Sequence, residues 1–299
     1  MISSAIVREI ETETGFRVLP SSGKSVSGGC IHQSAIFETE GAGSLFVKQN
    51  NSEALQLFET EFRSLGWLAS TETIRVPRPL HFGEIGGTAY LVLEALSLYN
   101  RSDSDSSRKM GQALARLHSA ADDRFGDDRF GDDRFGADYD NFIGATPQPN
   151  PWTESWADFF TKHRLEHMFQ LAAKRGKLFQ DEGRLLGAVH RHLSSLDISP
   201  SLLHGDFWGG NASFDMNGDP VLFDPASYMG DREADIAFTR VFGGFGPGFY
   251  EAYRETFPEP EPIRETVYNL YHILNHFVLF GGGYGDQADT MIREIMGSR

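Results

Sequence analysis

One segment, residues 204–224, constrains the fold more than any other part of the sequence. It begins as a polar loop that ends at Asn211. Two short strands, residues 212–216 and 220–224, are expected next, on either side of Asn217-Gly218, a dipeptide typical of tight hairpin turns. Such a hairpin brings its last residue, Asp224, back beside Asn211. We therefore expect a fold in which a loop and a hairpin present polar side chains to one point.

The spacing within this loop indicates a chemistry. His204, Asp206 and Asn211 form the pattern His-x-Asp-x-x-x-x-Asn, which is the spacing of a kinase catalytic loop. Phosphoryl transfer needs a carboxylate that orients the attacking hydroxyl and accepts its proton, and Asp206 is the candidate. Asn211 and Asp224 offer hard oxygen ligands, which suit a Mg²⁺ ion that bridges nucleotide phosphates. Asp and Asn are also common in turns and caps, but the spacing and the hairpin together favour the chemical role.

The first part of the chain is expected to hold the nucleotide. Lys48 lies in an apolar strand, residues 44–49, and a lysine buried there needs a partner. Glu59 and Glu61 lie on the next expected helix, residues 53–70, and Glu61 is the preferred partner. A strand lysine paired with a helix glutamate is the kinase device for holding the α- and β-phosphates. The alternative is an edge-strand lysine in solvent.

Two further features of this part are candidates for nucleotide contacts. Gly28-Gly29-Cys30 lies between two expected strands, where backbone amides can cover phosphates, although Gly-Gly turns are common. Glu94 ends an apolar strand, residues 88–93, and we place it among the nucleotide-binding residues. Cys30 is the one cysteine of the chain, and a redox-sensitive thiol is our hypothesis for it. An inert, small, buried residue is the alternative.

The pattern of the whole chain indicates two parts. Strands are expected at residues 18–25, 31–39, 44–49 and 88–93, and a polar, turn-like stretch follows at residues 101–107. Helices are expected beyond it, at residues 108–120, 152–173, 181–196, 232–242, 246–257 and 263–280. This order predicts an α+β protein with a small, strand-rich first domain, residues 1–97, and a larger, mostly helical second domain, residues 98–299.

Composition excludes several classes of protein. Asp and Glu outnumber Lys and Arg by 42 to 27, so the net charge is −15, and neither a nucleic acid nor an anionic membrane surface is an expected partner. No stretch of 18 consecutive apolar residues predicts a membrane helix, and the first residues do not form a signal-peptide pattern. A single cysteine excludes an intrachain disulfide. The expectation is a cytoplasmic protein.

Several residues downstream are candidates for contact with the acceptor. Trp208 lies two positions after Asp206 and could stack on the apolar face of a sugar ring, with simple core packing as the alternative. His272, Asn275 and His276 lie beside a glycine-rich run and could line a polar pocket. Buried helix histidines with partners inside the protein are an equally good interpretation of this group.

Two other segments have weaker interpretations. Asp235, near the start of the helix expected at residues 232–242, could hydrogen-bond back to the catalytic loop or could be a surface carboxylate. Asp-Asp-Arg-Phe-Gly occurs three times in tandem at residues 122–136. A period of five is too short for a solenoid repeat, so we favour a duplicated, solvated loop over an acidic interaction site.

These motifs together resemble the fructosamine kinase family, over roughly residues 16 to 290. The most specific runs are His204-Gly205-Asp206-Phe207-Trp208-Gly209-Gly210-Asn211, Phe223-Asp224-Pro225-Ala226, Gly230-Asp231-Arg232-Glu233-Ala234-Asp235, and Leu270-Tyr271-His272-Ile273-Leu274-Asn275-His276 with Phe280-Gly281-Gly282-Gly283-Tyr284. Further runs are Gly28-Gly29-Cys30-Ile31, Phe46-Val47-Lys48, Phe58-Glu59-Thr60-Glu61, Leu114-Ala115-Arg116-Leu117-His118 and Asn141-Phe142-Ile143-Gly144.

The resemblance implies a two-lobed, protein-kinase-like fold, of the kind shared with aminoglycoside and choline phosphotransferases. It implies ATP and Mg²⁺ as cofactors, and transfer of the γ-phosphoryl group to the sugar 3-hydroxyl of a ketosamine, free or on a protein lysine, as protein deglycation repair. Asp206 would then be the base, and Asn211 and Asp224 the metal ligands. Lys48 with Glu61 would hold phosphates that the glycine loop covers.

Two other functions stay open at this point. A phosphotransferase acting on an aminoglycoside or choline would use the same fold, and the acidic surface suits either kind of cationic substrate. A non-catalytic nucleotide-binding scaffold is a third reading, against which the joint presence of Lys48, Asp206, Asn211 and Asp224 argues. A monomer is expected, with a disulfide-linked dimer through Cys30 as the alternative.

Overall fold

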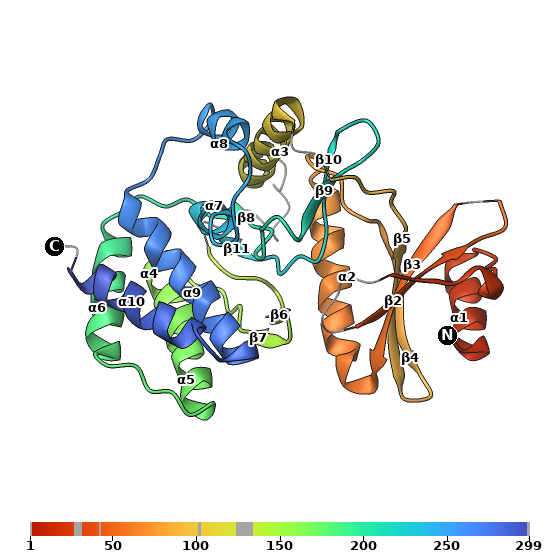
Figure 1. Ribbon diagram of the computed structural model, residues 1–299, viewed down its shortest axis with the longest axis horizontal. Coiled ribbons are helices and arrows are strands. Elements are labelled where there is room, and N and C mark those ends of the chain that lie inside the picture. The colour runs from red at the N-terminus through yellow and green to blue at the C-terminus, as the bar shows by residue number, and fades with distance from the viewer. Residues whose placement is uncertain (1, 27–31, 42, 101–102, 124–133, 298–299) are drawn as a thin grey trace.

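Five strands between residues 24 and 94 form one antiparallel sheet in the order β1-β2-β3-β5-β4 (Figure 1). The computed structural model describes residues 2–26, 32–41, 43–100, 103–123 and 134–297. The strands are β1 (Lys24–Val26), β2 (Gln33–Glu38), β3 (Ser44–Asn51), β4 (Pro79–Ile85) and β5 (Thr88–Glu94). β3 lies in the middle, so Lys48 pairs in register with Ser34 on one side and Leu91 on the other.

Two helices cover the two faces of this sheet. They are α1 (Ser4–Thr14) and α2 (Leu55–Ser70), and a short 3₁₀ turn, Ser52–Ala54, leads into the second. Successive side chains of a strand point to opposite faces, and β5 uses both. Tyr90 and Val92 join the buried cluster that contains α1, whereas Leu91 and Leu93 join the cluster that contains α2.

The remainder of the chain is mostly helical, as the left part of Figure 1 shows. The helices are α3 (Ser104–Asp123), α4 (Trp156–Phe160), α5 (His167–Lys174), α6 (Glu182–Ser194), α7 (Glu233–Thr239), α8 (Pro247–Arg254), α9 (Pro262–Phe280) and α10 (Tyr284–Gly297). One π-helical turn, Thr161–Glu166, joins α4 to α5. The apolar helix α9 packs against α7, α10 and α5, which places it at the centre of the largest buried cluster.

Three short antiparallel strand pairs lie among the helices of the larger, mostly helical part. They are β6 (Asn141–Ile143) with β7 (Thr146–Gln148), β8 (Ser201–Leu202) with β11 (Met229–Gly230), and β9 (Ala212–Phe214) with β10 (Pro220–Leu222). Single bridges join Phe214 to Tyr99 and Val221 to Arg75. The β9–β10 hairpin is therefore fixed against the two segments that flank the last strands of the sheet.

The α+β fold is as predicted, but several elements differ from the expectation. α1 and α10 were not predicted, and neither were β6 and β7. β4 was not predicted either; it begins at Pro79, because a proline is tolerated as the first residue of an edge strand. The β9–β10 connection spans residues 215–219 rather than two residues, since Asp215 Oδ1 accepts the backbone N–H of Asn217 and of Asp219.

The predicted boundary between residues 97 and 98 falls in the connection between β5 and α3.

In the part of the chain that the structure describes, every helix is too short or too polar to span a bilayer.

Candidate active site

A cavity of about 660 Å³ lies between the sheet and the helical part. Its walls include Lys48 and Glu61 from the sheet side, and Asp206, Asn211 and Asp224 from the helical side. The catalytic, nucleotide-binding and metal-ligating candidates that the structure describes thus line one space. Apolar side chains of β2, β3 and β5 also line the sheet side, among them Ile36, Phe46 and Leu93.

Lys48 joins the two walls. Its Nζ lies 2.7 Å from Glu61 Oε1 and 2.6 Å from Asp224 Oδ1, and both Lys48 and Glu61 are buried. Glu59, the alternative partner, faces Arg63 at 3.9 Å. Burial opposes the charge of Lys48, but Asp224 and then Glu61 outweigh it and raise the pKa of the lysine. Lys48 is therefore a permanent cation at the point where nucleotide phosphates would lie.

The two carboxylates beside Lys48 have different environments. Burial raises the pKa of Glu61 to about 7, against the opposing charge of Lys48. Burial also acts to raise the pKa of Asp224, but the charge and hydrogen bond of Lys48 prevail and hold it below its usual value. The Asp224 side chain is 48% exposed to the cavity, which leaves it open to a ligand. Its backbone has a φ of 56°, a left-handed conformation that is uncommon outside glycine and typical of functional positions.

The catalytic loop holds Asp206 and Asn211 together. Asn211 Nδ2 donates to Asp206 Oδ2 at 2.8 Å and to the Asp206 backbone oxygen at 2.9 Å. Two oxygen neighbours fix the identity of this nitrogen, so Asn211 Oδ1 is the atom that points away from Asp206. Burial raises the pKa of Asp206 to about 7, although the hydrogen bond from Asn211 opposes this rise. A carboxylate poised near neutral pH suits proton transfer.

His204 and Gly205 shape the backbone of this loop. His204 is buried; its Nε2 lies 3.1 Å from the Phe223 carbonyl oxygen, and its Nδ1 accepts the Asp206 N–H at 3.3 Å. Burial lowers the pKa of His204, so the neutral ring with hydrogen on Nε2 fits both contacts. Gly205 has a φ of +83°, and a Cβ there would lie 2.0 Å from the Ala226 carbonyl oxygen. The imidazole thus ties the loop to the residue that precedes Asp224.

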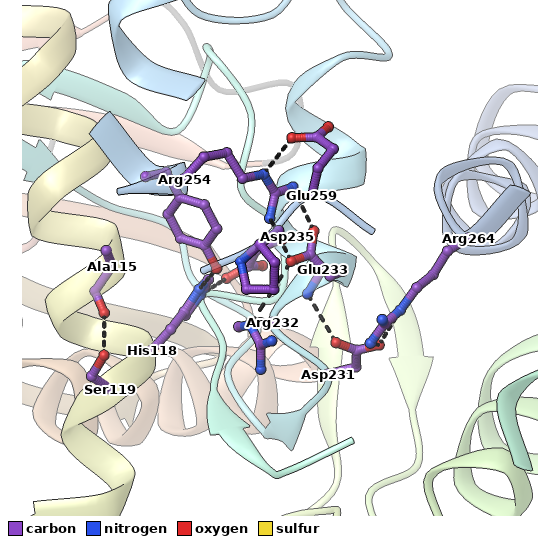
Figure 2. A network of polar contacts seen from close by, with 12 residues as sticks. Ala115, His118, Ser119, Asp231, Arg232, Glu233, Asp235, Arg254, Glu259 and Arg264 are labelled. Atoms are coloured by element: carbon purple, nitrogen blue, oxygen red, sulfur yellow. Dashed lines mark hydrogen bonds and ion pairs between the residues drawn. The ribbon is translucent and has the colours of Figure 1, made fainter. Parts of the chain in front are cut away.

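Asp235, which Figure 2 shows beside His118, anchors the same loop through both of its carboxylate oxygens. Its Oδ2 accepts the His204 N–H at 2.7 Å, and its Oδ1 accepts the Gly205 N–H at 2.9 Å. The link back to the loop expected for Asp235 is therefore present. His118 of α3 completes the arrangement, with Nε2 at 3.2 Å from Asp235 Oδ2 and Nδ1 at 2.8 Å from the Tyr253 hydroxyl. No role for His118 was predicted from the sequence.

Of the other nucleotide-binding candidates, Glu94 is among the residues that the structure describes, and the three residues of the glycine loop are not. Glu94 lines the cavity, but its carboxylate pairs with Arg75 at 2.5 Å. Gly28, Gly29 and Cys30 lie outside the described residues, so their contact with phosphates and a Cys30-linked dimer stay predictions. His32, which follows them, lines the cavity and contacts Asn50 through Nδ1 at 2.9 Å.

The donor set fits a hard divalent cation bound together with phosphates. Asn211 Oδ1 and Asp224 Oδ2 make no hydrogen bond within the part of the chain that the structure describes, and both residues line the cavity. Within that part there is no cluster of three or more His, Cys, Asp or Glu side chains suited to a metal. Two protein oxygens are few for an all-protein site but ordinary where phosphates and water complete the coordination, as with Mg²⁺.

The acceptor candidates separate into two groups. Trp208 lines the cavity beside Asp206, and its ring contacts Phe242 edge-on at 5.4 Å. His272 and Asn275 are buried inside α9 and do not line the cavity; His272 stacks on Phe238 at 3.6 Å. His276 is half-buried and also lies off the cavity wall, with its Nδ1 against the His272 carbonyl oxygen. A direct acceptor contact by these three residues finds no geometric support.

The hairpin β6–β7 is the part of the cavity wall that sequence reasoning missed. Phe142 and Gly144 line the cavity next to the catalytic loop. The run Asn141-Phe142-Ile143-Gly144 carried part of the family resemblance, but it contains no titratable or metal-ligating pattern from which a site could be derived. The structure alone shows that Phe142 is the less buried residue between two buried neighbours in β6.

A lysine–glutamate pair on the sheet, facing an Asp–Asn loop and a second aspartate across one cavity, defines a protein-kinase-like phosphotransferase. The comparisons with known proteins agree. A family model described as Fructosamine kinase matches residues 2–298. The chain therefore belongs to the fructosamine kinase family, as the resemblance of its motifs indicated.

Individual relatives extend over nearly the whole chain. A Synechocystis protein named "Probable ketoamine kinase" is 45% identical over 295 residues, which cover 97% of this chain and 96% of the relative. The chloroplastic protein-ribulosamine 3-kinase of Arabidopsis thaliana is 36% identical over 91% of this chain and 82% of its own length. A crystal structure from Haemophilus somnus, provisionally named a fructosamine-3-kinase, has a TM-score of 0.86 at 29% identity, covering 97% of this chain and 96% of that one. Choline and aminoglycoside kinases at 15% identity share the fold alone.

Proposed function

We propose that this protein uses ATP to phosphorylate the 3-hydroxyl of ketosamines, sugars joined to an amine, in free form or on protein lysines. The observation that carries the proposal is the convergence of Lys48, Asp206, Asn211 and Asp224 on one cavity, in a chain that belongs to the fructosamine kinase family. Relatives named as ketoamine and ribulosamine 3-kinases support the acceptor class. Such a reaction would serve the repair of glycated protein.

Each residue has a part in the transfer. Lys48, fixed by Glu61, would neutralise the phosphates of ATP. Asp206 would orient the acceptor hydroxyl and take its proton as the new O–P bond forms and the bond to the departing ADP breaks. The raised pKa of Asp206, about 7, keeps this carboxylate able to hold the proton that it receives.

Asn211 and Asp224 would hold Mg²⁺ through Asn211 Oδ1 and an oxygen of Asp224. The ion, when bound, neutralises charge that develops on the phosphates. Asp224 would then turn from Lys48 toward the ion, while Lys48 turns toward the phosphates.

The test is ATP consumption with Mg²⁺ against ribuloselysine, fructoselysine, a panel of aminoglycosides, and choline. Wild type is compared with Asp206→Asn, which keeps the shape of the side chain and removes the base. We expect phosphorylation of a ketosamine, and a loss of about 10²- to 10⁴-fold in kcat in the variant with ATP binding retained. Turnover of an aminoglycoside or choline alone would refute the ketosamine substrate. ATP binding without any turnover would support the non-catalytic scaffold.

A further inference from the structure

The hairpin β6–β7 forms a wall of the active cavity that the proposed chemistry leaves unused. Phe142 and Gly144 line the same space as Asp206, Trp208 and Asp224. Figure 1 shows the hairpin between α2 and the helices of the larger part, and contacts of β6 with α2 and of β7 with α9 agree with this placement. Phe142 is half-buried while both of its neighbours in β6 are buried, so strand alternation leaves its ring at the cavity.

The back of the hairpin is tied to the segment that follows Asp224. Asn141 Nδ2 donates to the Ser227 carbonyl oxygen at 2.9 Å, and Gln148 Nε2 donates to the Ala226 carbonyl oxygen at 3.2 Å. The Ala226 N–H in turn donates to the His204 carbonyl oxygen at 2.9 Å. These bonds fix the hairpin relative to both the metal-ligand segment and the catalytic loop.

A buried arginine holds the end of the hairpin. Arg164 is fully buried; its Nη1 donates to the Pro149 carbonyl oxygen at 2.7 Å, and its Nη2 donates to Asn150 Oδ1 at 2.6 Å. Asn150 Nδ2 passes the connection on to Asn141 Oδ1 at 2.9 Å. The guanidinium lies over the ring of Tyr228 at 4.1 Å. The π-helical turn Thr161–Glu166 contains Arg164, and such turns often occur at functional sites.

The charge of Arg164 is costly to bury in this way. Among the described residues no carboxylate lies within ion-pair distance of it, and carbonyl oxygens and aromatic faces take the place of one. A hydrophobic residue of similar size would stabilise a core as well as a buried ion does. A planar group with several donors, however, also fixes the position of what it contacts. We therefore read Arg164 as a positioning residue for the hairpin.

The place of Phe142 indicates what its ring would contact. The sheet wall already supplies apolar side chains for a nucleotide base, from Ile36, Phe46 and Leu93. Phe142 comes from the other wall, beside the proposed base and metal ligands. A sugar ring has apolar C–H faces that pack well on an aromatic ring. We propose that Phe142 packs against the acceptor sugar and sets the preference for ketosamines, and that Arg164 positions it through the hairpin. This inference rests on the proposed function.

The first test is Phe142→Ala with separate kinetics for the two substrates. We expect the KM for fructoselysine or ribuloselysine to rise about tenfold, and the KM for ATP to stay within about twofold. Leu98→Ala is the control, because Leu98 is also an apolar residue of the cavity wall but is exposed and lies on the chain that leaves the sheet. In this control we expect any change in the KM for ATP rather than for the acceptor.

The second test addresses positioning. Arg164→Lys keeps the charge but removes the planar fork, so we expect a similar rise in the KM for the acceptor with a nearly unchanged KM for ATP. Combined with Phe142→Ala, it should add little further, since both changes remove the same contact. If Arg164→Lys does not fold, Asn150→Ala removes the acceptor of its Nη2 and is measured instead.

The outcomes separate the two proposals. Wild-type turnover of a ketosamine together with an unchanged acceptor KM in Phe142→Ala would overturn this inference and leave the proposed function standing. Additive effects of Phe142→Ala and Arg164→Lys would overturn the positioning role of Arg164. A wild-type protein that phosphorylates no ketosamine would refute the proposed function, and this inference with it.

Discussion

At the scale of single residues, Gly205 is a position where any side chain would disturb the conformation of the catalytic loop. A Cβ would lie 2.0 Å from the Ala226 carbonyl oxygen, and the φ of +83° is strained for any other residue. We expect Gly205→Ala to displace Asp206, with a loss of at least about 2 kcal/mol in the free energy of unfolding and more than about tenfold in kcat. Thermal unfolding and steady-state kinetics measure the two effects.

Gly209→Ala is the matched control in the same loop. A Cβ at Gly209 would meet nothing within 4 Å, and the backbone there needs no left-handed φ. We expect kcat and the melting temperature to change little. Equal losses in the two alanine variants would show that the loop tolerates neither substitution and that the close approach to Ala226 is not the cause.

Most individual site residues could be predicted because they lie close together in the sequence, at separations typical of a known chemistry. Asp206, Asn211 and Asp224 lie on one loop and one hairpin, so local structure alone brings them together. The preference for Glu61 over Glu59 agrees with the pair that forms, since Lys48 contacts Glu61. His118 hydrogen-bonds to Asp235, which lies 117 positions further along the chain. Phe142 lines the cavity together with Asp206, which is more than 60 positions away. Sequence spacing does not predict contacts at such separations.

At the scale of elements, α9 carries a buried titratable group whose effect on stability can be measured. Burial lowers the pKa of His272 well below its usual value, and the neighbouring His276 and Arg164 act in the same direction. The unfolded chain therefore binds a proton below about pH 6.5 that the folded chain does not bind. Stability is full above that pH and falls below it, by at most about 1.4 kcal/mol per pH unit from this residue.

We expect His272→Phe to remove this part of the pH dependence. Phe keeps an aromatic ring against Phe238, which His272 stacks on at 3.6 Å. Urea unfolding of both proteins at pH 7.5 and 5.5 gives the free energy lost on acidification, and the variant should lose about 1 kcal/mol less than wild type. Other buried groups, such as His204, contribute equally to both proteins. Equal losses in the two proteins would contradict a buried, neutral His272.

The elements predicted well are those with a strong local pattern. Strands β3 and β5 and helix α9 have long apolar runs, and their bounds differ from the expected ones by at most two residues. α1 was missed because polar residues occupy most of its sequence and its stability comes from packing Ile6 and Ile10 on the sheet. α10 was missed because the glycine run before it suggested a loop, although its buried residues Ala288, Ile292 and Ile295 recur at helical spacing. Tertiary packing decided α1, whereas the pattern for α10 was present in the sequence.

At the scale of the whole molecule, three acidic side chains at the start of α7 connect distant parts of the chain (Figure 2). Asp231 contacts Arg264 of α9, Glu233 contacts Arg254 of α8 at 2.7 Å, and Asp235 contacts the catalytic loop and His118 of α3. A single helical turn thus sets where three helices and the loop lie relative to one another. Removing one carboxylate should disturb the reaction from a distance.

We expect Asp235→Asn to lower kcat at least about tenfold while the KM for ATP changes little, because the amide cannot accept both loop N–H groups and contact His118. The free energy of unfolding should fall by about 1–3 kcal/mol, as one buried polar group loses its partner. Asp181→Asn, at an exposed carboxylate before α6, is the control. A variant that lost stability but kept the wild-type kcat would limit Asp235 to a structural role.

The contact of Lys48 with Asp224 has a consequence for the order in which ligands arrive. Lys48 Nζ lies 2.6 Å from Asp224 Oδ1, so an ammonium of the sheet occupies one side of a carboxylate that we propose as a metal ligand. A free divalent cation would be repelled by the positive charge of Lys48. A cation that arrives bound to the phosphates of a nucleotide would bring negative charge, and Lys48 could pair with that charge instead of with Asp224. Metal affinity and nucleotide affinity should then share a coupling free energy, so that each ligand recruits the other. Lys48 thus competes with a free metal ion for the Asp224 carboxylate, so that Asp224 binds the ion that arrives together with the nucleotide.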